Sequence, residues 1–320
     1  MGLLSEKTRR VIALFAGVML LAGGFAFPAH AQSQAQFRIG YQKYGTLVLL
    51  KAQGTLEKRL APHKIEVKWT EFPAGPVMLE GLNVGSIDLG QVGETPPIFA
   101  QAAGADLVYV GFEPPEPEGE AIVVKKDSAI KTVAELKGKK VALNKGSNVH
   151  YLLVKQLEKA GLRYLDIDVS FLPPADARAA FERGSVDAWV IWDPFLAAAQ
   201  KQLGARVLAD GKGAVNNTSF YLASRAYAEK NPKVIDVVLE ELARLDEWAR
   251  NNRKDVAALL GSYIGIEKSI AELSVSHNSY GVKPIDDTVL EQQQQIADTF
   301  FDLKLIPKAV KVRDAVLKKR

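Results

Sequence analysis

Cysteine is absent from this chain of 320 residues, and histidine is scarce, with four. Without cysteine there can be no disulfide framework and no thiol-linked lipid anchor, and a zinc site would lack its commonest sulfur ligand. The histidines beyond residue 31 are His63, His150 and His277, which show no metal-ligand spacing and no obvious partner for base catalysis. We therefore expect neither a metal nor a cofactor.

Catalytic sequence motifs are missing as well. The chain contains no G-x-S-x-G turn, no Walker loop and no H-E-x-x-H pair. Its segment Gly211-Lys212-Gly213 lacks the upstream glycine and the following hydroxyl residue of a phosphate-binding loop. These absences favour a ligand-binding protein over an enzyme.

A strong excess of one charge is also lacking. Lysine and arginine number 41 against 37 aspartate and glutamate residues, which gives a net charge of +4. We expect no nucleic-acid partner, because no basic patch or stripe is visible in the sequence.

The first 31 residues have the organisation of an export signal. An apolar run at residues 11–27 follows three basic residues, and small residues occupy positions 29 and 31, where signal peptidase requires them. We expect residues 1–31 to be a signal peptide cleaved after Ala31, which places the mature protein in the periplasm. An uncleaved anchor is the alternative, and the choice between the general and the twin-arginine export routes stays open.

The rest of the chain alternates short β-branched runs with amphipathic stretches, which is the pattern of parallel sheets covered by helices. Strands are predicted at residues 37–40, 65–69, 87–90, 107–110, 121–124, 140–143, 167–171, 188–191, 206–208 and 220–223. Helices at residues 232–252, 255–261, 267–275 and 286–302 end the chain, and we expect them to pack onto the first lobe. The glutamines at residues 292–295 are expected on an exposed helix face.

Two irregular segments divide this pattern into two lobes. Pro114, Pro115 and Pro117 alternate with glutamates in a stretch too stiff for a helix, which we interpret as a hinge strand. A second connection, at residues 210–218, returns the chain. We expect lobe 1 to comprise residues 32–118 and 215–320, and lobe 2 to comprise residues 119–214.

A short sequence pattern that occurs twice supports two similar lobes. Asp88 and Asp187 each follow a helix that ends in Gly-Ser and one aliphatic residue, and each opens a strand. Each strand is followed by a helix-start signal with proline, Thr95-Pro96 in the first case and Asp193-Pro194 in the second.

Candidate ligand-binding residues lie in four turns that follow strands. In an open α/β sheet, ligands bind beyond the carboxyl ends of the strands, where the next helices present free N–H groups. The turns contain Gln42, Lys43 and Tyr44; Gly93, Glu94 and Thr95; Gly146, Ser147 and Asn148; and Trp192 and Asp193. We expect these turns, two from each lobe, to surround an anion. Thr95, Ser147, Asn148 and Asp193 are expected to cap their own helices in any case, and this structural role alone is the alternative.

Several side chains at these turns allow more than one interpretation. Tyr44, Phe72, Trp192 and Tyr221 could cover an alkyl group of the ligand or serve only in packing, whereas Tyr41 is expected to be core. Glu94 is costly near an anion. It could pair with Lys43, turn away from the site, or select a ligand that carries an amine.

Six segments closely resemble the aliphatic sulfonate-binding proteins of ABC importers. They are residues 37–44 (FRIGYQKY), 71–88 (EFPAGPVMLEGLNVGSID), 94–110 (ETPPIFAQAAGADLVYV), 175–181 (ADARAAF), 187–195 (DAWVIWDPF) and 219–223 (SFYLA). The resemblance spans nearly the whole chain beyond the signal and is specific to the sulfonate, taurine and nitrate binders as a group.

The resemblance implies an α/β, two-lobe periplasmic-binding-protein fold, type II-like, with two hinge crossings and a C-terminal helical extension. It further implies a monomer that delivers a small organosulfonate to an ABC permease and its ATPase and touches the membrane only through them. Transferred to this sequence, the family's ligand-proximal residues are Gln42, Lys43, Tyr44, Thr95, Ser147, Asn148, Trp192 and Asp193. A binder of taurine, nitrate or another oxyanion, a sensor subunit, and an enzyme of the thiamine-pyrimidine or menaquinone type on the same fold remain alternatives.

Overall fold

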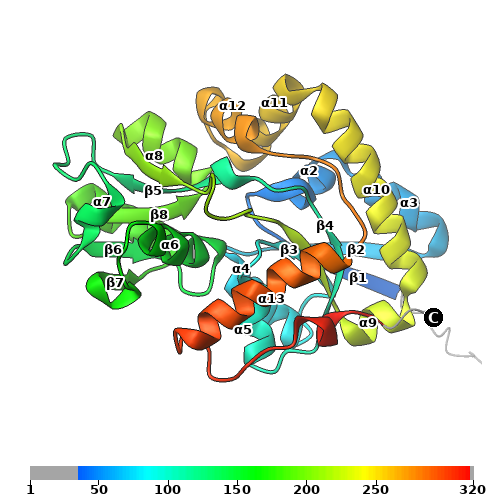
Figure 1. Cartoon of the computed structure of the whole chain (residues 1–320). Helices are drawn as coiled ribbons and strands as arrows, with labels where there is room; N and C mark the ends of the chain where they lie inside the picture. The colour runs from blue at the N-terminus through cyan, green and yellow to red at the C-terminus, as the bar shows by residue number, and fades with distance from the viewer. Residues whose placement is uncertain (1–34, 318–320) are drawn as a thin grey trace, which may run out of the picture. The chain divides into compact units, whose positions relative to one another are not determined.

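The computed structural model describes residues 35–317. Two five-stranded sheets organise them (Figure 1). The first has the order β2 (Ile65–Glu71), β1 (Ala35–Tyr41), β3 (Leu89–Val92), β10 (Phe220–Ser224), β4 (Leu107–Phe112). The second has the order β7 (Asp168–Phe171), β6 (Lys140–Leu143), β8 (Ala188–Trp192), β5 (Glu120–Val124), β9 (Arg206–Asp210). We call each sheet with its covering helices lobe 1 and lobe 2; the signal peptide expected at residues 1–31 lies outside the described residues.

Each of the ten predicted strands is present, but the sheets are mixed, whereas the sequence pattern predicted parallel ones. In lobe 1, β1 pairs in parallel with β2 and β3, whereas β10 is antiparallel to β3 and β4. In lobe 2, β5 is antiparallel to β8 and β9. The cause is the connection between the lobes, because β5 and β10 each follow a crossing and therefore enter the sheet at the edge where its parallel strands end.

Helices cover both faces of the lobe 1 sheet. One face packs against α2 (Gly45–Gln53), α3 (Thr55–Leu60), α10 (Pro232–Asn251) and α11 (Arg253–Ile264), and the other against α4 (Gly75–Asn83), α5 (Pro96–Ala102) and α13 (Asp287–Asp302), while α9 (Arg225–Lys230) follows β10. Lobe 2 is covered by α6 (Asn148–Lys159), α7 (Pro174–Arg183) and α8 (Phe195–Leu203). Leu50, Val238 and Leu242 are fully buried between helices and sheet, and each such side chain stabilises the fold by about 1.5–3 kcal/mol.

One C-terminal helix departs from the predicted packing. All four were expected on lobe 1, but α12 (Lys268–His277) packs against α8 of lobe 2 as well as against α11. Ile270 is buried against Ala197 and Ala198, whose small side chains let the two helices approach. Figure 1 shows α12 at the lobe 2 end of the α10–α12 layer. The extension thus contacts both lobes.

The first crossing is not the predicted hinge strand. Residues 114–116 form no regular structure, and a short 3-10 turn, η2 (Pro117–Gly119), follows them. Proline offers no N–H to a sheet ladder, so the segment is fixed by other bonds. Glu113 and Glu116 are buried, and their backbone N–H groups bond to the carbonyls of Ser219 and Asn216 in the second crossing.

The sequence pattern that occurs at both Asp88 and Asp187 corresponds to equivalent contacts in the two lobes. Asp88 accepts the backbone N–H of Arg38 at 2.8 Å, and Asp187 accepts that of Lys140 at 2.8 Å. Each aspartate also returns its own N–H to the carbonyl of the same partner. Both therefore fasten the start of a central strand to the neighbouring parallel strand.

Within residues 35–317, none of the helices combines the length and apolar character needed to cross a bilayer.

Candidate ligand-binding site

The turn after β3 meets the start of α6 across the two lobes. A Cβ atom added to Gly93 would lie 2.9 Å from Cβ of Asn148, so only glycine allows this approach. Asn148 donates its side-chain N–H to Oδ1 of Asn217, 3.0 Å away in the second crossing, and also to Glu120 at the start of β5. Ala74, which precedes α4 in lobe 1, belongs to the apolar cluster of lobe 2. The lobes are therefore in direct contact here.

Four of the nine buried side-chain atoms that lack a hydrogen-bond partner among the described residues lie at this contact. Among the described residues, Glu94 Oε1, Thr95 Oγ1, Glu120 Oε1 and Asn144 Oδ1 are buried and make no hydrogen bond. Glu94 and Thr95 belong to the lobe 1 turn, whereas Glu120 and Asn144 belong to lobe 2. An unpaired buried polar group is costly, so such a group calls for a partner that the protein itself does not supply.

Glu94 is held by the second crossing and by α13 rather than by Lys43. It does not pair with Lys43, whose ammonium lies 3.7 Å from Glu71 on the surface. Its Oε2 accepts the backbone N–H of Thr218 at 3.1 Å, and its own carbonyl accepts from Gln293 at 2.8 Å. Burial raises the pKa of Glu94 to about 7, although backbone donors of the second crossing oppose this shift.

A second buried carboxyl faces Glu94 from lobe 2. Glu120 is fully buried, and burial together with the nearby charge of Glu94 raises its pKa well above the usual range. In the first crossing, burial raises the pKa of Glu116 to about 8. Carboxyls with raised pKa values therefore line the interior between the lobes.

The predicted helix caps are mostly wrong. In the part of the chain that the structure describes, Thr95 and Ser147 make no side-chain cap bond at α5 and α6, and Asn148 is the first residue of α6 rather than its cap. The Ser147 hydroxyl instead donates to the carbonyl of Asn144 at 2.7 Å. Only Asp193 acts as expected, because its Oδ1 accepts the N–H of Ala197 at 3.0 Å. Cap preference describes an average, and bonds across turns and lobes override it.

The four predicted helix starts differ in what they can offer an anion. The α5 start carries Pro96 and Pro97, which have no N–H. The α8 start already holds the Asp193 carboxylate, and Leu47 in α2 donates its N–H to Gln91. The first turn of α6 begins at the interlobe contact. The N–H groups of Ser147 and His150 there bond to the carbonyls of Asn144 and Ser147, so those of Asn148 and Val149 are left for a ligand. We infer that α6 is the strongest anion donor of the four.

Tyr44 and Tyr221 support the crossings. The Tyr44 hydroxyl lies 2.6 Å from Ser219 Oγ and donates to Glu116 at 3.2 Å. Tyr221 is fully buried, and its hydroxyl bonds to Thr46 and Glu113. These contacts tie the start of α2 to both crossings, which is a structural role compatible with a ligand nearby.

The other predicted residues are divided between the contact and the periphery. Gly146, at φ +72°, donates its N–H to His150 and packs against Phe99 of lobe 1. Gln42 is buried and donates to the carbonyl of Gln91 at 3.1 Å. Trp192 is buried in lobe 2.

Two of the candidates lie apart from that contact. Lys43 is exposed, and the ring of Phe72 packs under α4 against Gly40 and Gly81 within lobe 1. Tyr41 is core, as predicted, with its ring edge-on to Trp69.

His277 has a partner that the sequence did not suggest. Its Nδ1 lies 2.6 Å from Oδ2 of Asp193, so the last residue of α12 bonds to the turn that begins α8. The hydrogen bond to Asp193 raises the pKa of His277, although its partial burial opposes the shift. Within residues 35–317, no cluster of histidine and carboxylate side chains is arranged to hold a metal ion.

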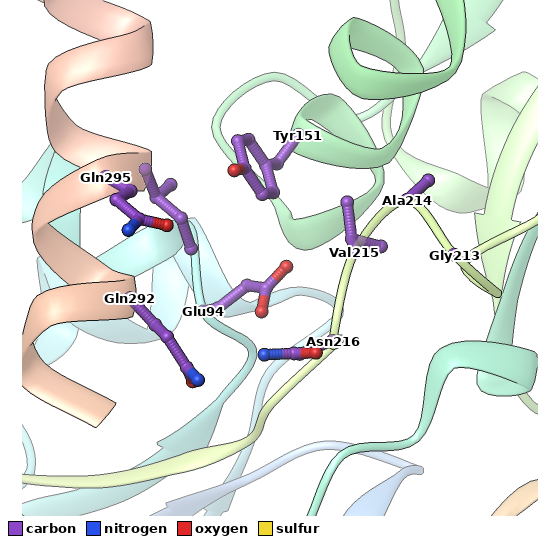
Figure 2. A pocket seen from close by; sticks show the side chains of 9 residues that line it. Glu94, Tyr151, Gly213, Ala214, Val215, Asn216, Gln292 and Gln295 are labelled. Atoms are coloured by element: carbon purple, nitrogen blue, oxygen red, sulfur yellow. The ribbon is translucent and has the colours of Figure 1, made fainter. Parts of the chain in front are cut away.

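A pocket of about 240 Å³ opens beside Glu94 (Figure 2). Figure 2 shows the Glu94 carboxylate between the glutamines of α13 and the second crossing, with Tyr151 of α6 on a third side. The lining residues are Glu94, Tyr151, Gly213, Ala214, Val215, Asn216, Gln292, Gln295 and Ile296. The glutamine run predicted to be an exposed face thus lines a pocket in part, and its member Gln293 is buried against Glu94.

The sequence and the fold are similar to those of characterised proteins. Residues 30–261 match the NMT1-like family. An Escherichia coli (strain K12) protein named for binding aliphatic sulfonates is 49% identical over 310 residues, which are 96% of each chain. The chain belongs to this family of aliphatic sulfonate-binding proteins.

Solved structures of sulfonate-binding proteins share the fold. The alkanesulfonate-binding protein SsuA from Xanthomonas axonopodis pv. citri, bound to MOPS, superposes with a TM-score of 0.85 at 45% identity, covering 89% of this chain and 99% of that one. The periplasmic aliphatic sulphonate binding protein SsuA from Escherichia coli gives 0.81 at 50% identity, covering 90% and 94%. The two-lobe α/β fold and the family suggested by the sequence are confirmed, and these similar proteins are binding proteins, not enzymes.

Sequence reasoning missed several residues at the contact of this sulfonate-binding family member. Glu120 was not predicted, because it is the first residue of a strand directly after the proline-rich crossing and does not lie in a turn that follows a strand. Asn217, at φ +52°, lies in the second crossing and bonds to both Asn148 and the carbonyl of Glu116. Asparagine tolerates that backbone conformation. The occurrence of Asn217 in a Gly/Asn-rich connection was the one feature of the sequence that could have indicated it.

Proposed function

We propose that this protein is the extracytoplasmic substrate-binding component of an ABC importer and that it captures an aliphatic sulfonate between its lobes. The observation that carries the proposal is the set of partnerless buried polar atoms at Glu94, Thr95, Glu120 and Asn144, contributed by both lobes where they meet. Similar proteins of the family are named for sulfonate binding, and one of them was solved with MOPS, a sulfonate.

Anion capture on this site relies on backbone dipoles more than on cations. The α6 start supplies the N–H groups of Asn148 and Val149 and the positive end of a helix dipole. Binding in the micromolar range needs about 8 kcal/mol, and charge-assisted hydrogen bonds contribute about 1.5–3 kcal/mol each. Three to five such bonds therefore suffice after ordering costs. Candidate contributors remain the thirteen residues predicted from sequence, with Ser147 and Asn148 favoured by their place at α6.

The organisation of the importer component follows from the same proposal. Residues 1–31 are the signal peptide, cleaved after Ala31; residues 32–118 and 215–320 form lobe 1, and residues 119–214 form lobe 2. The mature protein is a periplasmic monomer that presents its ligand to a permease and ATPase and touches the membrane only through them. The two-sheet division and the two crossings support these boundaries.

A calorimetric titration of the purified secreted protein tests the function. We expect heat and a thermal shift with ethanesulfonate or MES at micromolar concentration, and none with nitrate or sulfate. Nitrate binding without sulfonate binding would indicate a nitrate-binding protein instead. Turnover of a bound ligand, followed by mass spectrometry, would indicate an enzyme.

A further inference from the structure

Glu94 lines the pocket and keeps one carboxyl oxygen without a partner. Its Oε2 accepts the backbone N–H of Thr218, whereas Oε1 is buried without a partner among the described residues. Glu94 is 3% exposed, and this burial raises its pKa to about 7, although the N–H bond from Thr218 favours the charged form. When Glu94 is ionised, its remaining oxygen requires a donor.

The pocket supplies no positive charge to that oxygen. Among its lining residues, all within the described part of the chain, Glu94 and Tyr151 are the only titratable ones, and neither is basic. From lobe 2, Glu120 adds a second acidic group. Lys159 approaches Gly213, and Lys212 precedes it in the chain. Figure 2 places Gly213 away from the Glu94 carboxylate.

The partnerless atoms at the contact are mostly acceptors. Asn144 Oδ1 accepts only, and Glu94 Oε1 and Glu120 Oε1 do so when ionised. A plain alkanesulfonate offers oxygen acceptors alone, so it cannot satisfy Asn144 or an ionised carboxylate. An ammonium group offers up to three N–H donors and a positive charge, and Val215 and Ile296 can cover an adjacent carbon chain.

We propose that the preferred ligands are aminosulfonates, in which a protonated amine is bound by the free oxygen of Glu94 in the pocket between α6, α13 and the second crossing, while the sulfonate faces the α6 start. This inference rests on the proposed function and assigns Glu94 the choice of substrate class. A protonated Glu94 that donates to a sulfonate oxygen is the competing arrangement, and the two depend on pH in opposite directions.

A pair of ligands of matched length separates these arrangements. Calorimetry compares 3-aminopropane-1-sulfonate with butane-1-sulfonate, which replaces the ammonium by a methyl group, at pH 6 and at pH 8. At pH 8 we expect the amino ligand to bind about tenfold to a hundredfold more tightly, as a charge-assisted hydrogen bond implies. The preference should shrink at pH 6, because the carboxylate becomes protonated while the amine stays charged.

The variant Glu94→Gln removes the charge and keeps the shape, and its amide oxygen can still accept from Thr218. We expect it to lose the preference for the amino ligand and to bind butanesulfonate at least as well as the wild type. Glu291→Gln removes the same charge from an exposed position of α13 and should leave the preference unchanged.

The possible outcomes test the role of Glu94 separately from the proposed function on which it rests. Equal or tighter binding of butanesulfonate by the wild type, or full preference retained in Glu94→Gln, overturns the role of Glu94 alone. An affinity for 3-aminopropane-1-sulfonate that falls from pH 6 to pH 8 in the wild type and is pH-independent in Glu94→Gln overturns it in favour of the protonated donor. Binding of neither sulfonate overturns the proposed function and this inference with it.

Discussion

His277 and Asp193 join the C-terminal extension to lobe 2 through a hydrogen bond of 2.6 Å between Nδ1 and Oδ2. The second Asp193 oxygen accepts the N–H of Ala197, so one fully buried carboxylate serves both the α8 start and α12. Because α12 packs against α11 as well as against α8, this pair adds a polar contact between lobe 2 and the C-terminal helices.

The stabilising effect of His277 should depend on pH. Asp193 raises the pKa of His277 above its unfolded value, so the stabilisation is fully present below about pH 6.5 and is lost as the pH rises through the folded pKa. We expect His277→Gln to lower the free energy of unfolding by about 1–3 kcal/mol at pH 5.5 and by less at pH 8.5. Urea denaturation at both pH values measures this, and the exposed His63→Gln is the control; a loss that is equal at the two pH values would contradict it.

Asp88 and Asp187 have equivalent backbone contacts but unequal surroundings. Asp88 is 4% exposed and also pairs with the Arg38 guanidinium at 2.6 Å, whereas Asp187 is exposed. Asp88→Ala should therefore cost about 1–3 kcal/mol of unfolding free energy, and Asp187→Ala less than about 1 kcal/mol. Chemical denaturation of the two variants provides a matched comparison. Equal losses of unfolding free energy would show that the backbone bonds to the neighbouring strand, and not the buried ion pair, determine the effect.

Asn148 links both lobes through its bonds to Glu120 and Asn217. We expect Asn148→Ala to weaken sulfonate binding by about tenfold or more, since it removes the interlobe bond and leaves buried acceptors unpaired. Small-angle scattering should show a larger radius of gyration for the variant with ligand than for the wild type. Asn251→Ala, at an exposed position of α10, is the control; unchanged affinity and radius in Asn148→Ala would remove this residue from the site.

Glu116 should make the protein less stable at alkaline pH. Burial raises the pKa of Glu116 to about 8 although Ser279 and Tyr44 donate to it, so its folded state favours the protonated form. The contribution is fully present below about pH 4.5 and is lost progressively as the pH rises from there to about 8. We expect Glu116→Gln to flatten the decline of the melting temperature between pH 6 and 9, relative to the exposed Glu118→Gln. An identical decline in both variants would contradict this.

The strands, the crossings and the family were predictable because their signals are local. Short runs rich in apolar residues mark most of the strands, and Asp88 and Asp187 repeat a short local pattern at equivalent strand starts. The direction of β5 and β10 was not predictable, because it depends on the path of the chain between lobes rather than on side-chain periodicity.

The meeting of two of the predicted turns was predictable, but their bonds were not. The turn at Glu94 and the start of α6 meet as the strand-end rule requires. The partners of Glu94 and His277, however, are Thr218 and Asp193, which lie 124 and 84 residues away in sequence. No local pattern encodes such contacts, and cap preference misassigned Thr95 and Ser147 for the same reason.

A crystal structure of the secreted protein grown with a saturating organosulfonate tests the central claim most directly. We expect the sulfonate between the lobes, with its oxygens within hydrogen-bond distance of the α6 start and its other end toward the turn that contains Glu94 and Thr95. Sulfonate density elsewhere on the protein, in crystals of a sample that binds the same compound by calorimetry, would contradict the site.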